Sequence, residues 1–211
     1  MRNKLIVFEG IDSSGKATQV ALLAKRLRQK GKKVAVFSVP RYGTPVGKLI
    51  KAALHGEYGD FRHLDPHLSA IPYLMDYALA RESFVAALKK GDVIFDRYVQ
   101  STFAYHAAKL SGKKQAAFLR QFEGIAFKEI KLPKPDKVIY LDVPQAISRK
   151  LMSTRTRDQH ERDNAYQKKV AAVYQKMARG TNWCTIRCAP KGKLLSRREV
   201  HELVWKAVHR V

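Results

Sequence analysis

Residues 10–17 read GIDSSGKA, a glycine-rich loop that ends in a lysine and an alanine. Gly10 and Gly15 allow the backbone to curl so that its N–H groups point inward, and Lys16 can reach the outer phosphates of a nucleoside triphosphate. A short apolar run precedes the loop and a helical pattern follows it, which is the context in which this motif binds phosphate. The loop therefore predicts a phosphate site. A tight strand-to-helix turn without a ligand is the alternative.

The residue after the lysine departs from the usual phosphate loop, G-x-x-x-x-G-K-[ST], whose last hydroxyl holds magnesium. Ala17 has no hydroxyl, but Thr18 follows it and Asp12 adds a carboxylate within the loop. Magnesium keeps several waters and needs few protein ligands besides phosphates. We therefore expect altered support of the metal rather than loss of nucleotide binding.

A carboxylate–arginine pair ends another apolar run, VIFDRY. Asp96 falls at the carboxyl end of an expected strand, and Arg97 beside it can make two parallel hydrogen bonds to a phosphate. We interpret both as site residues that face the phosphate loop. A buried pair that only joins strand to helix is the alternative.

Residues 149–162, RKLMSTRTRDQHER, are rich in basic side chains. A flap that carries arginines can close over a transferring phosphoryl group and neutralise the charge that develops on it. We predict a short basic lid here, and an exposed basic helix end is the alternative. Its cations are Arg149, Lys150, Arg155, Arg157 and Arg162.

The residues around the site favour an anionic phosphate acceptor over an alcohol. An alcohol needs a carboxylate base nearby, whereas a nucleoside monophosphate is mostly dianionic at pH 7, with a second pKa of about 6. After the second expected strand the chain has Pro40, Arg41 and Tyr42, with no carboxylate. These residues and Arg97 together predict a site built to hold an anion.

Tyr77 and Arg81 are four residues apart in a helical stretch and so share one helix face. An aromatic ring there can stack on a base while the arginine bonds the edge of that base. An ordinary helix surface is the alternative.

The elements that must position these residues alternate between strands and helices. Such alternation predicts an α/β fold, a doubly wound parallel sheet with helices on both faces, whose ligands bind beyond the carboxyl ends of the strands. Strands are expected at 5–9, 34–39, 92–96, 137–143 and, more weakly, 183–187. Helices are expected at 18–29, 65–90, 101–110, 114–130, 145–152, 162–179 and 196–209.

Length and composition limit the class of protein. A chain of 211 residues, 45% of them hydrophobic, suffices for one domain, 1–211, with the lid at about 149–162. Its apolar stretches are shorter than the roughly 20 residues of a membrane helix, and the N-terminus does not look like a signal peptide, so we expect a cytoplasmic protein with no membrane partner. Cys184 and Cys188 lack further zinc ligands at suitable spacing and are expected to be structural, reduced thiols.

The formal net charge is +23, from 41 Lys and Arg against 18 Asp and Glu. Such a surface attracts polyanions. The basic residues are dispersed, however, which favours a solvated basic coat and no specific nucleic-acid partner.

These motifs occur in order and at the spacing of thymidylate kinases, and the resemblance extends from Leu5 to about Tyr174. It implies transfer of the γ-phosphoryl of ATP, with magnesium (Mg2+), to dTMP to give dTDP, a step of dTTP synthesis. It also implies a five-stranded parallel sheet of the P-loop nucleoside monophosphate kinase type, usually in a homodimer. The segments that carry it are FEGIDSSGKATQ, VPRYGTPVGKLI, the Tyr77–Arg81 pair, DRYVQSTFAYHAAKL, LPKPDKVIYLDV and the basic lid.

The resemblance implies roles for residues on the dTMP side. Tyr77 matches the aromatic residue that stacks on thymine and Arg81 the arginine that bonds the base edge. Arg97 with Tyr42 matches the groups that hold the dTMP phosphate. Tyr105 matches a tyrosine lying where a ribose 2′-hydroxyl would go, and Thr102 lies by the base edge.

On the ATP side, the resemblance implies that the loop and the lid hold the nucleotide. Catalytic roles fall to Lys16, Asp12, Asp96, Arg97 and the lid residue Arg155, and metal-facing roles to Asp12 and Glu161. Which lid arginine touches ATP stays open. The ATP-binding candidates are Gly10, Ile11, Asp12, Ser13, Ser14, Gly15, Lys16, Ala17, Thr18, Arg149 and Arg157.

Two other hypotheses remain. A deoxynucleoside kinase is the first, although Arg41 in place of a carboxylate and the DRY segment argue against it. The second is an inactive basic phosphate-loop protein that binds nucleic acid, which Ala17 and the net charge support.

Overall fold

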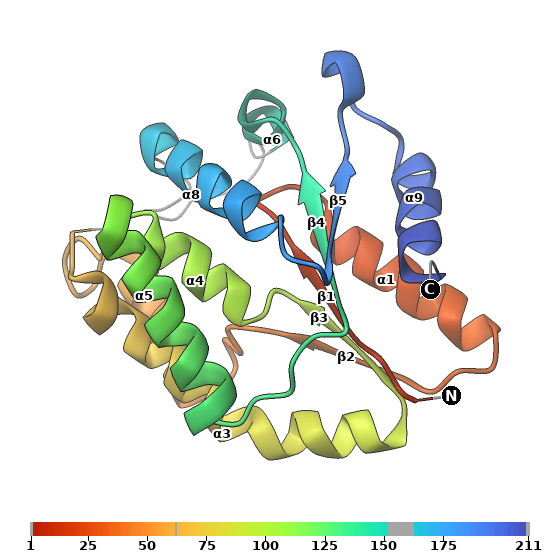
Figure 1. The fold of residues 1–211 in the computed structure, drawn as a ribbon, viewed down its shortest axis with the longest axis horizontal. Coiled ribbons are helices and arrows are strands. Elements are labelled where there is room, and N and C mark those ends of the chain that lie inside the picture. Colours follow the sequence, from red (N-terminus) through yellow and green to blue (C-terminus); the bar gives the residue numbers. More distant parts are fainter. Residues whose placement is uncertain (1, 62, 152–162, 210–211) are drawn as a thin grey trace.

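The computed structural model describes residues 2–61, 63–151 and 163–209. The described part contains a five-stranded sheet in the order β2-β3-β1-β4-β5, in which every neighbouring pair is parallel. This architecture confirms the predicted α/β class (Figure 1). The strands are β1 (Leu5–Glu9), β2 (Val34–Ser38), β3 (Asp92–Asp96), β4 (Lys137–Asp142) and β5 (Trp183–Arg187).

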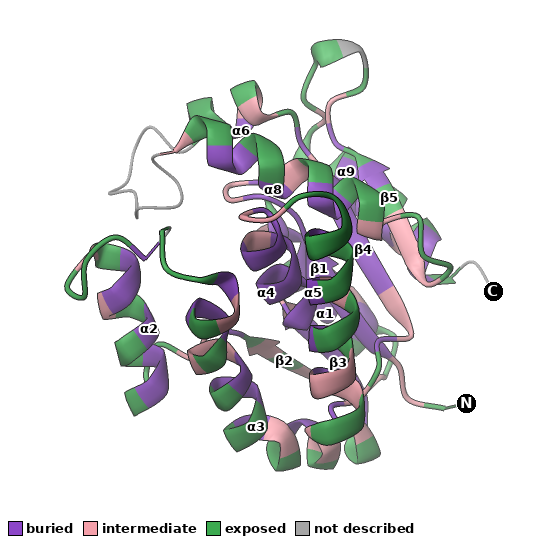
Figure 2. Cartoon of the chain, turned by 60° about the vertical axis from the view of Figure 1, so that its left-hand side comes forward, coloured by how far each residue is buried: buried purple, intermediate pink, exposed green. Residues whose placement is uncertain are grey.

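Helices cover both faces of the sheet because successive strand residues point to opposite sides. In β1, Leu5 and Val7 join the larger core cluster, whereas Ile6 and Phe8 join the smaller one. The larger cluster packs under α3 (Pro66–Lys90), α4 (Val99–Ala107), α5 (Gly112–Gly124) and α8 (Asn164–Met177). The smaller one packs under α1 (Lys16–Gln29) and α9 (Arg197–His209). The central strand β1 is buried throughout, and its neighbours β3 and β4 are buried except at terminal residues (Figure 2).

The sheet order opens a crevice above β1 and β3. These two strands are neighbours, with Phe8 opposite Asp96. The chain leaves β1 toward α1 on one face and leaves β3 toward α4 on the other (Figure 1). A parallel sheet binds ligands at such a divergence, beyond the carboxyl ends of its strands.

Helix α2 (Pro45–His55) was not among the predicted helices. It has ordinary end signals. The Thr44 hydroxyl accepts a hydrogen bond from the Gly47 N–H at 3.1 Å, Pro45 is the first helical residue, and Gly56 ends the helix in the left-handed region at φ 92°. These signals were available in the sequence and were missed.

The other predicted helices are present with shifted ends. Helix α4 begins at Val99 rather than 101 because Glu9 of β1 accepts hydrogen bonds from the N–H groups of Tyr98 and Ser101, at 2.9 and 3.2 Å. That cap comes from a distant strand. The remaining elements are α6 (Gln145–Leu151), a π-helical turn (Ile125–Glu129) that extends α5, and a 3₁₀ turn (Pro190–Gly192).

Two further predictions concern the whole chain. Among the described residues, no helix combines the length and apolar character needed to cross a membrane. Cys188 is buried and Cys184 half-buried, and both are free thiols. Most of the predicted lid, residues 152–162, lies outside the described residues.

Candidate active site

The glycine-rich loop curls through left-handed backbone conformations at Ser13 (φ 55°) and Gly15 (φ 87°). At Gly10 (φ 146°) a Cβ atom would lie 2.8 Å from the carbonyl oxygen of Leu141. A glycine is therefore required there for both conformation and space. Gly15 is the N-cap residue of α1 and has no side chain to occupy the first N–H groups of that helix, which leaves a site for an anion.

Lys16 lies folded over this loop and is only 7% exposed. Its Nζ donates to the carbonyl oxygens of Gly10 and Ile11, at 3.1 and 2.8 Å. Burial, and next the charge of Arg97, lower the pKa of Lys16 to about 8, while Asp12 and Asp96 act in the opposite direction.

Arg97 brings the loop and the DRY segment together. It holds a left-handed backbone conformation at φ 67°, which a non-glycine residue rarely adopts and which is common at functional sites. Its guanidinium donates to the Gly10 carbonyl oxygen at 3.2 Å and to Ser101 Oγ at 3.1 Å, and it forms an ion pair with Asp12. Desolvation tends to lower the pKa of Arg97, but Asp12 and other neighbours outweigh it, so that the pKa lies above its ordinary value and the group stays charged.

Tyr105 completes this cluster. Its hydroxyl donates to the second carboxylate oxygen of Asp12 at 2.6 Å. Asp12, Arg97 and Tyr105, three residues predicted for the site, are thus brought into direct contact from two distant segments.

Glu9 is a site residue that sequence reasoning missed. It is fully buried at the end of β1 and, besides capping α4, its Oε2 accepts from the hydroxyls of Ser101 (2.6 Å) and Tyr174 (2.8 Å). Burial raises the pKa of Glu9, against the effects of Arg97 and these hydrogen bonds. The alternation of side chains along β1 could have placed Glu9 on the α4 side of the sheet. The signal in the sequence was an acidic residue in an apolar run.

A cavity of about 80 Å³ that opens to solvent lies beside this cluster. The lining residues are Asp12, Val39, Pro40, Tyr42, Leu54, Tyr73, Tyr77, Arg97, Ser101, Thr102, Tyr105 and His106.

The structure places two predicted substrate residues differently from expectation. Arg81 is not among the described residues that line the cavity. Its Nε donates to the Lys131 carbonyl oxygen at 3.0 Å, and its guanidinium pairs with Glu82. It shares a helix side with Tyr77 but lies one turn farther along α3, about 6 Å beyond it at the helix rise.

Tyr77 lines the cavity but is only 1% exposed, packed edge to face on Tyr98 with ring centroids 5.5 Å apart. Its ring face is therefore covered by protein. Tyr73, one turn before it, also lines the cavity and is only half-buried. The stacking role of Tyr77 and the base-edge role of Arg81 stay predictions.

Arg41 does not add a free cation to the site. It forms a salt bridge with the fully buried Asp76 of α3 at 2.8 Å, and its backbone N–H donates to the same carboxylate at 2.9 Å. The predicted anion site therefore has one cation fewer than expected, because the carboxylate of Asp76 neutralises Arg41.

Arg149 is exposed on α6, and the neighbouring Ser148 hydroxyl donates to the Asp12 carbonyl oxygen at 2.6 Å. Arg155, Arg157 and Glu161 lie outside the described residues.

No cluster of three acidic, histidine or cysteine side chains occurs in the described part of the chain. The two carboxylate oxygens of Asp12 are engaged by Arg97 and Tyr105. This arrangement fits a metal ion whose ligands are mainly phosphate oxygens and water.

Comparison with known proteins adds the family. The sequence model described as thymidylate kinase matches residues 8–199. This chain belongs to the thymidylate kinase family. The kinase is 36% identical over 201 residues to the thymidylate kinase of Mycobacterium tuberculosis, covering 86% of this chain and 90% of that protein. It is 32% identical to that of Caldanaerobacter subterraneus subsp. tengcongensis, covering 99% and 96%.

A solved thymidylate kinase structure from Candida albicans superposes with a TM-score of 0.76 at 22% identity, covering 98% of this chain and 91% of that one. This match supports the fold. The kinase phosphorylates dTMP to dTDP, with ATP as the substrate that supplies the phosphoryl group. Family membership thereby decides against the deoxynucleoside kinase and the inactive nucleic-acid-binding protein.

Proposed function

We propose that dTMP occupies the cavity with its phosphate at Arg97 and its base toward Tyr73, and that ATP lies on loop 10–18. The observation that carries this proposal is the bridging position of Arg97, which donates to the Gly10 carbonyl oxygen of the loop and also lines the cavity. A planar cation at the junction of two phosphate sites can hold both phosphates end to end.

The chemistry requires no base. An oxygen of the dTMP phosphate attacks the γ-phosphorus of ATP. The new P–O bond forms as the bond from that phosphorus to the β–γ bridging oxygen breaks, which leaves dTDP and ADP. Arg97, Lys16 and the loop N–H groups neutralise the charge that spreads over the transferring group.

The carboxylates around the loop have supporting roles in this proposal. Asp12 holds Arg97 in place, and Asp12 with Asp96 favours the charged form of Lys16. Tyr105, fixed on Asp12, and Tyr42, at the cavity mouth, contact the nucleotide sugar and phosphate. The lid residues Arg149, Arg155 and Arg157 stay predicted ATP contacts within a single domain of 1–211.

We also propose a magnesium ion on the ATP phosphates, with Asp12, Thr18 and Glu161 as its protein-side neighbours. When bound, the ion neutralises phosphate charge and aligns the two nucleotides. Ala17 offers no hydroxyl to it, so most of its ligands in this proposal are phosphate oxygens and water.

The homodimer expected from the resemblance is supported by one face of α3. Its large apolar side chains are exposed at helical spacing, a feature that marks interaction surfaces. They are Leu68 (56%), Ile71 (53%), Met75 (51%) and Leu79 (63%), here called the α3 apolar face. We propose that a second copy of this chain covers it.

Replacement of Arg97 tests the proposed placement. We expect Arg97→Ala to lower kcat/KM for dTMP by about 10²–10³-fold, the cost of removing one preorganised charge-stabilising donor. Arg120→Ala, on the exposed side of α5, is the matched control and should stay near wild type. Near-normal turnover of Arg97→Ala would contradict the proposal.

A further inference from the structure

Strand β5 is the outer strand of the sheet, and its outer edge is open (Figure 1). On its inner side, the Cys188 N–H just beyond β5 donates to the Asp142 carbonyl oxygen of β4 at 2.9 Å. Alternate residues of a parallel strand bond to the same neighbour, so Thr185 and Arg187, out of phase with Cys188, turn their N–H and C=O groups away from β4. Those groups have no hydrogen-bond partner among the described residues. Such an edge can take up a further strand.

A groove of about 790 Å³ lies along this edge between α8 and α9. In the described part of the chain, it shares no lining residue with the active-site cavity. Its two sides differ because strand side chains alternate between the faces of the sheet. Ile186 belongs to the core cluster under α9, and Trp183 packs on the cluster under α8. On the α9 side, the groove is lined by the apolar side chains of Leu195, Leu203 and Ala207.

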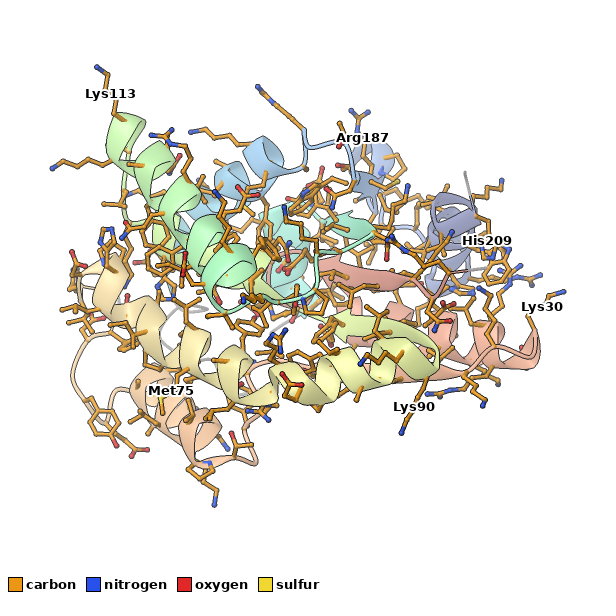
Figure 3. The ribbon with its side chains drawn as sticks, turned by 60° about the horizontal axis from the view of Figure 1, so that its bottom comes forward. Lys30, Met75, Lys90, Lys113, Arg187 and His209 are labelled. Carbon is orange, nitrogen blue, oxygen red and sulfur yellow. The ribbon has the colours of Figure 1, made fainter. Side chains whose placement is uncertain are left out.

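The rim of the groove is basic. Arg187 has the same phase along β5 as Trp183, so its side chain lies on the α8 side, where Arg179 also lines the groove. Lys206 of α9 adds a third cation, and all three side chains are exposed, with Arg187 reaching outward (Figure 3). Asp142 is the one carboxylate among the described lining residues. The groove therefore favours an acidic occupant.

We infer that an extended acidic segment of a partner protein adds to β5 as a sixth strand, in which acidic side chains alternate with apolar ones. Its backbone pairs with Thr185 and Arg187. Its acidic side chains lie on the α8 side near Arg179 and Arg187, and its apolar ones cover Leu195 and Leu203 on the α9 side. A second copy of this chain is disfavoured as the occupant, because its β5 would bring the same cations to the groove.

Hydrogen exchange of the wild-type enzyme tests the strand pairing. The probe is a peptide with blocked ends and the sequence ELELELE. At saturation it should slow exchange of the Thr185 and Arg187 N–H groups by about 10-fold or more, because both become hydrogen-bonded. The Cys188 N–H, already bonded to Asp142, is the internal control and should change little. The same peptide with every backbone nitrogen methylated keeps its side chains but cannot donate to the edge, and it should give no protection.

Titration calorimetry tests the charge. We expect Arg187→Glu to raise the Kd for ELELELE by about 10-fold or more, since it places like charges together. Lys113→Glu makes the same change in charge on the exposed side of α5 and should leave the Kd within about twofold. Both variants should phosphorylate dTMP at the wild-type rate, because neither residue lines the active-site cavity.

The sequence EELLLEE has the same composition as the probe but lacks its alternation, and it should bind at least about 10-fold more weakly. Equal binding of the two peptides would mean general attraction of anions to a basic surface and would overturn the inference. Unchanged exchange at Thr185 and Arg187 under saturating ELELELE, or equal weakening in Arg187→Glu and Lys113→Glu, would also overturn it.

Discussion

At the scale of single residues, the site depends on cations held among carboxylates. Burial of Lys16, and next the like charge of Arg97, lower the pKa of the lysine, while Asp12 and Asp96 favour the ammonium. The balance leaves the pKa of Lys16 at about 8. Arg97 shows the opposite result, a pKa above its ordinary value, because Asp12 pairs with it directly. In the free enzyme, this pair therefore consists of a permanent cation, Arg97, and a cation that titrates, Lys16.

Because the pKa of Lys16 lies at about 8, the free enzyme loses this ammonium as the pH rises through that value. We expect kcat/KM for ATP, which reports the free enzyme, to fall above pH about 8. At saturating ATP the phosphates stabilise the ammonium, so kcat/KM for dTMP should show no break there. A steady kcat/KM for ATP to pH well above this pKa would mean that Lys16 remains charged without a ligand.

At the scale of elements, a buried hydroxyl–carboxylate network connects β1, α4 and α8. The Tyr174 hydroxyl of α8 donates to Glu9 Oε2 at 2.8 Å and lies 2.9 Å from Ser101 Oγ. Ser101 Oγ in turn accepts from Arg97 at 3.1 Å. Helix α8 therefore supports the position of Arg97 through Ser101. Tyr174 itself is not among the described residues that line the cavity.

This arrangement predicts a positioning role for Tyr174. We expect Tyr174→Phe to lower kcat/KM for dTMP several-fold and the free energy of unfolding by about 1 kcal/mol, the net worth of a typical hydrogen bond. In the Arg97→Ala background the same change should have little further effect on kcat/KM, because its effect passes through Arg97.

Tyr140→Phe is the control for this double-mutant cycle. Tyr140 is also buried, stacks on Tyr174 with ring centroids 5.4 Å apart, and donates its hydroxyl to Asp142 at 3.5 Å. Fully additive losses for Tyr174→Phe and Arg97→Ala, or an equal loss in Tyr140→Phe, would indicate general destabilisation.

At the scale of the whole molecule, a strongly basic surface coexists with the α3 apolar face. The net charge of +23 belongs to dispersed side chains such as Lys30, Lys90 and Lys113, which extend outward at the ends of different helices (Figure 3). Two copies with this charge repel each other, so the proposed dimer has to be held by apolar burial and should grow stronger as salt screens the charge.

A charge within the α3 apolar face should separate the two copies. We expect Met75→Glu to convert a dimer to a monomer in light scattering at micromolar concentration, because the carboxylate would be buried without a partner. Lys30→Ala makes the same change in net charge at the other end of the molecule (Figure 3) and should leave the mass unchanged. A monomeric wild-type enzyme at high concentration and high salt would contradict the dimer proposal.

The sequence by itself determined the strands and the phosphate loop, because these depend on local patterns. The predicted bounds of β1, β3 and β5 agree with the structure at every residue, and Gly10, Gly15 and Lys16 carry their roles in their spacing. Helix α2 could also have been found from Thr44, Pro45 and Gly56.

Only the tertiary structure decided the strand order, the buried Glu9 network and which side chains of α3 reach the cavity. Helical periodicity puts Tyr73, Tyr77 and Arg81 on one side of α3, but it does not say where along the helix the neighbouring strands end. Packing on Tyr98 buries Tyr77, and the loop before β4 takes up Arg81. These contacts join residues far apart in the chain, so no local pattern records them.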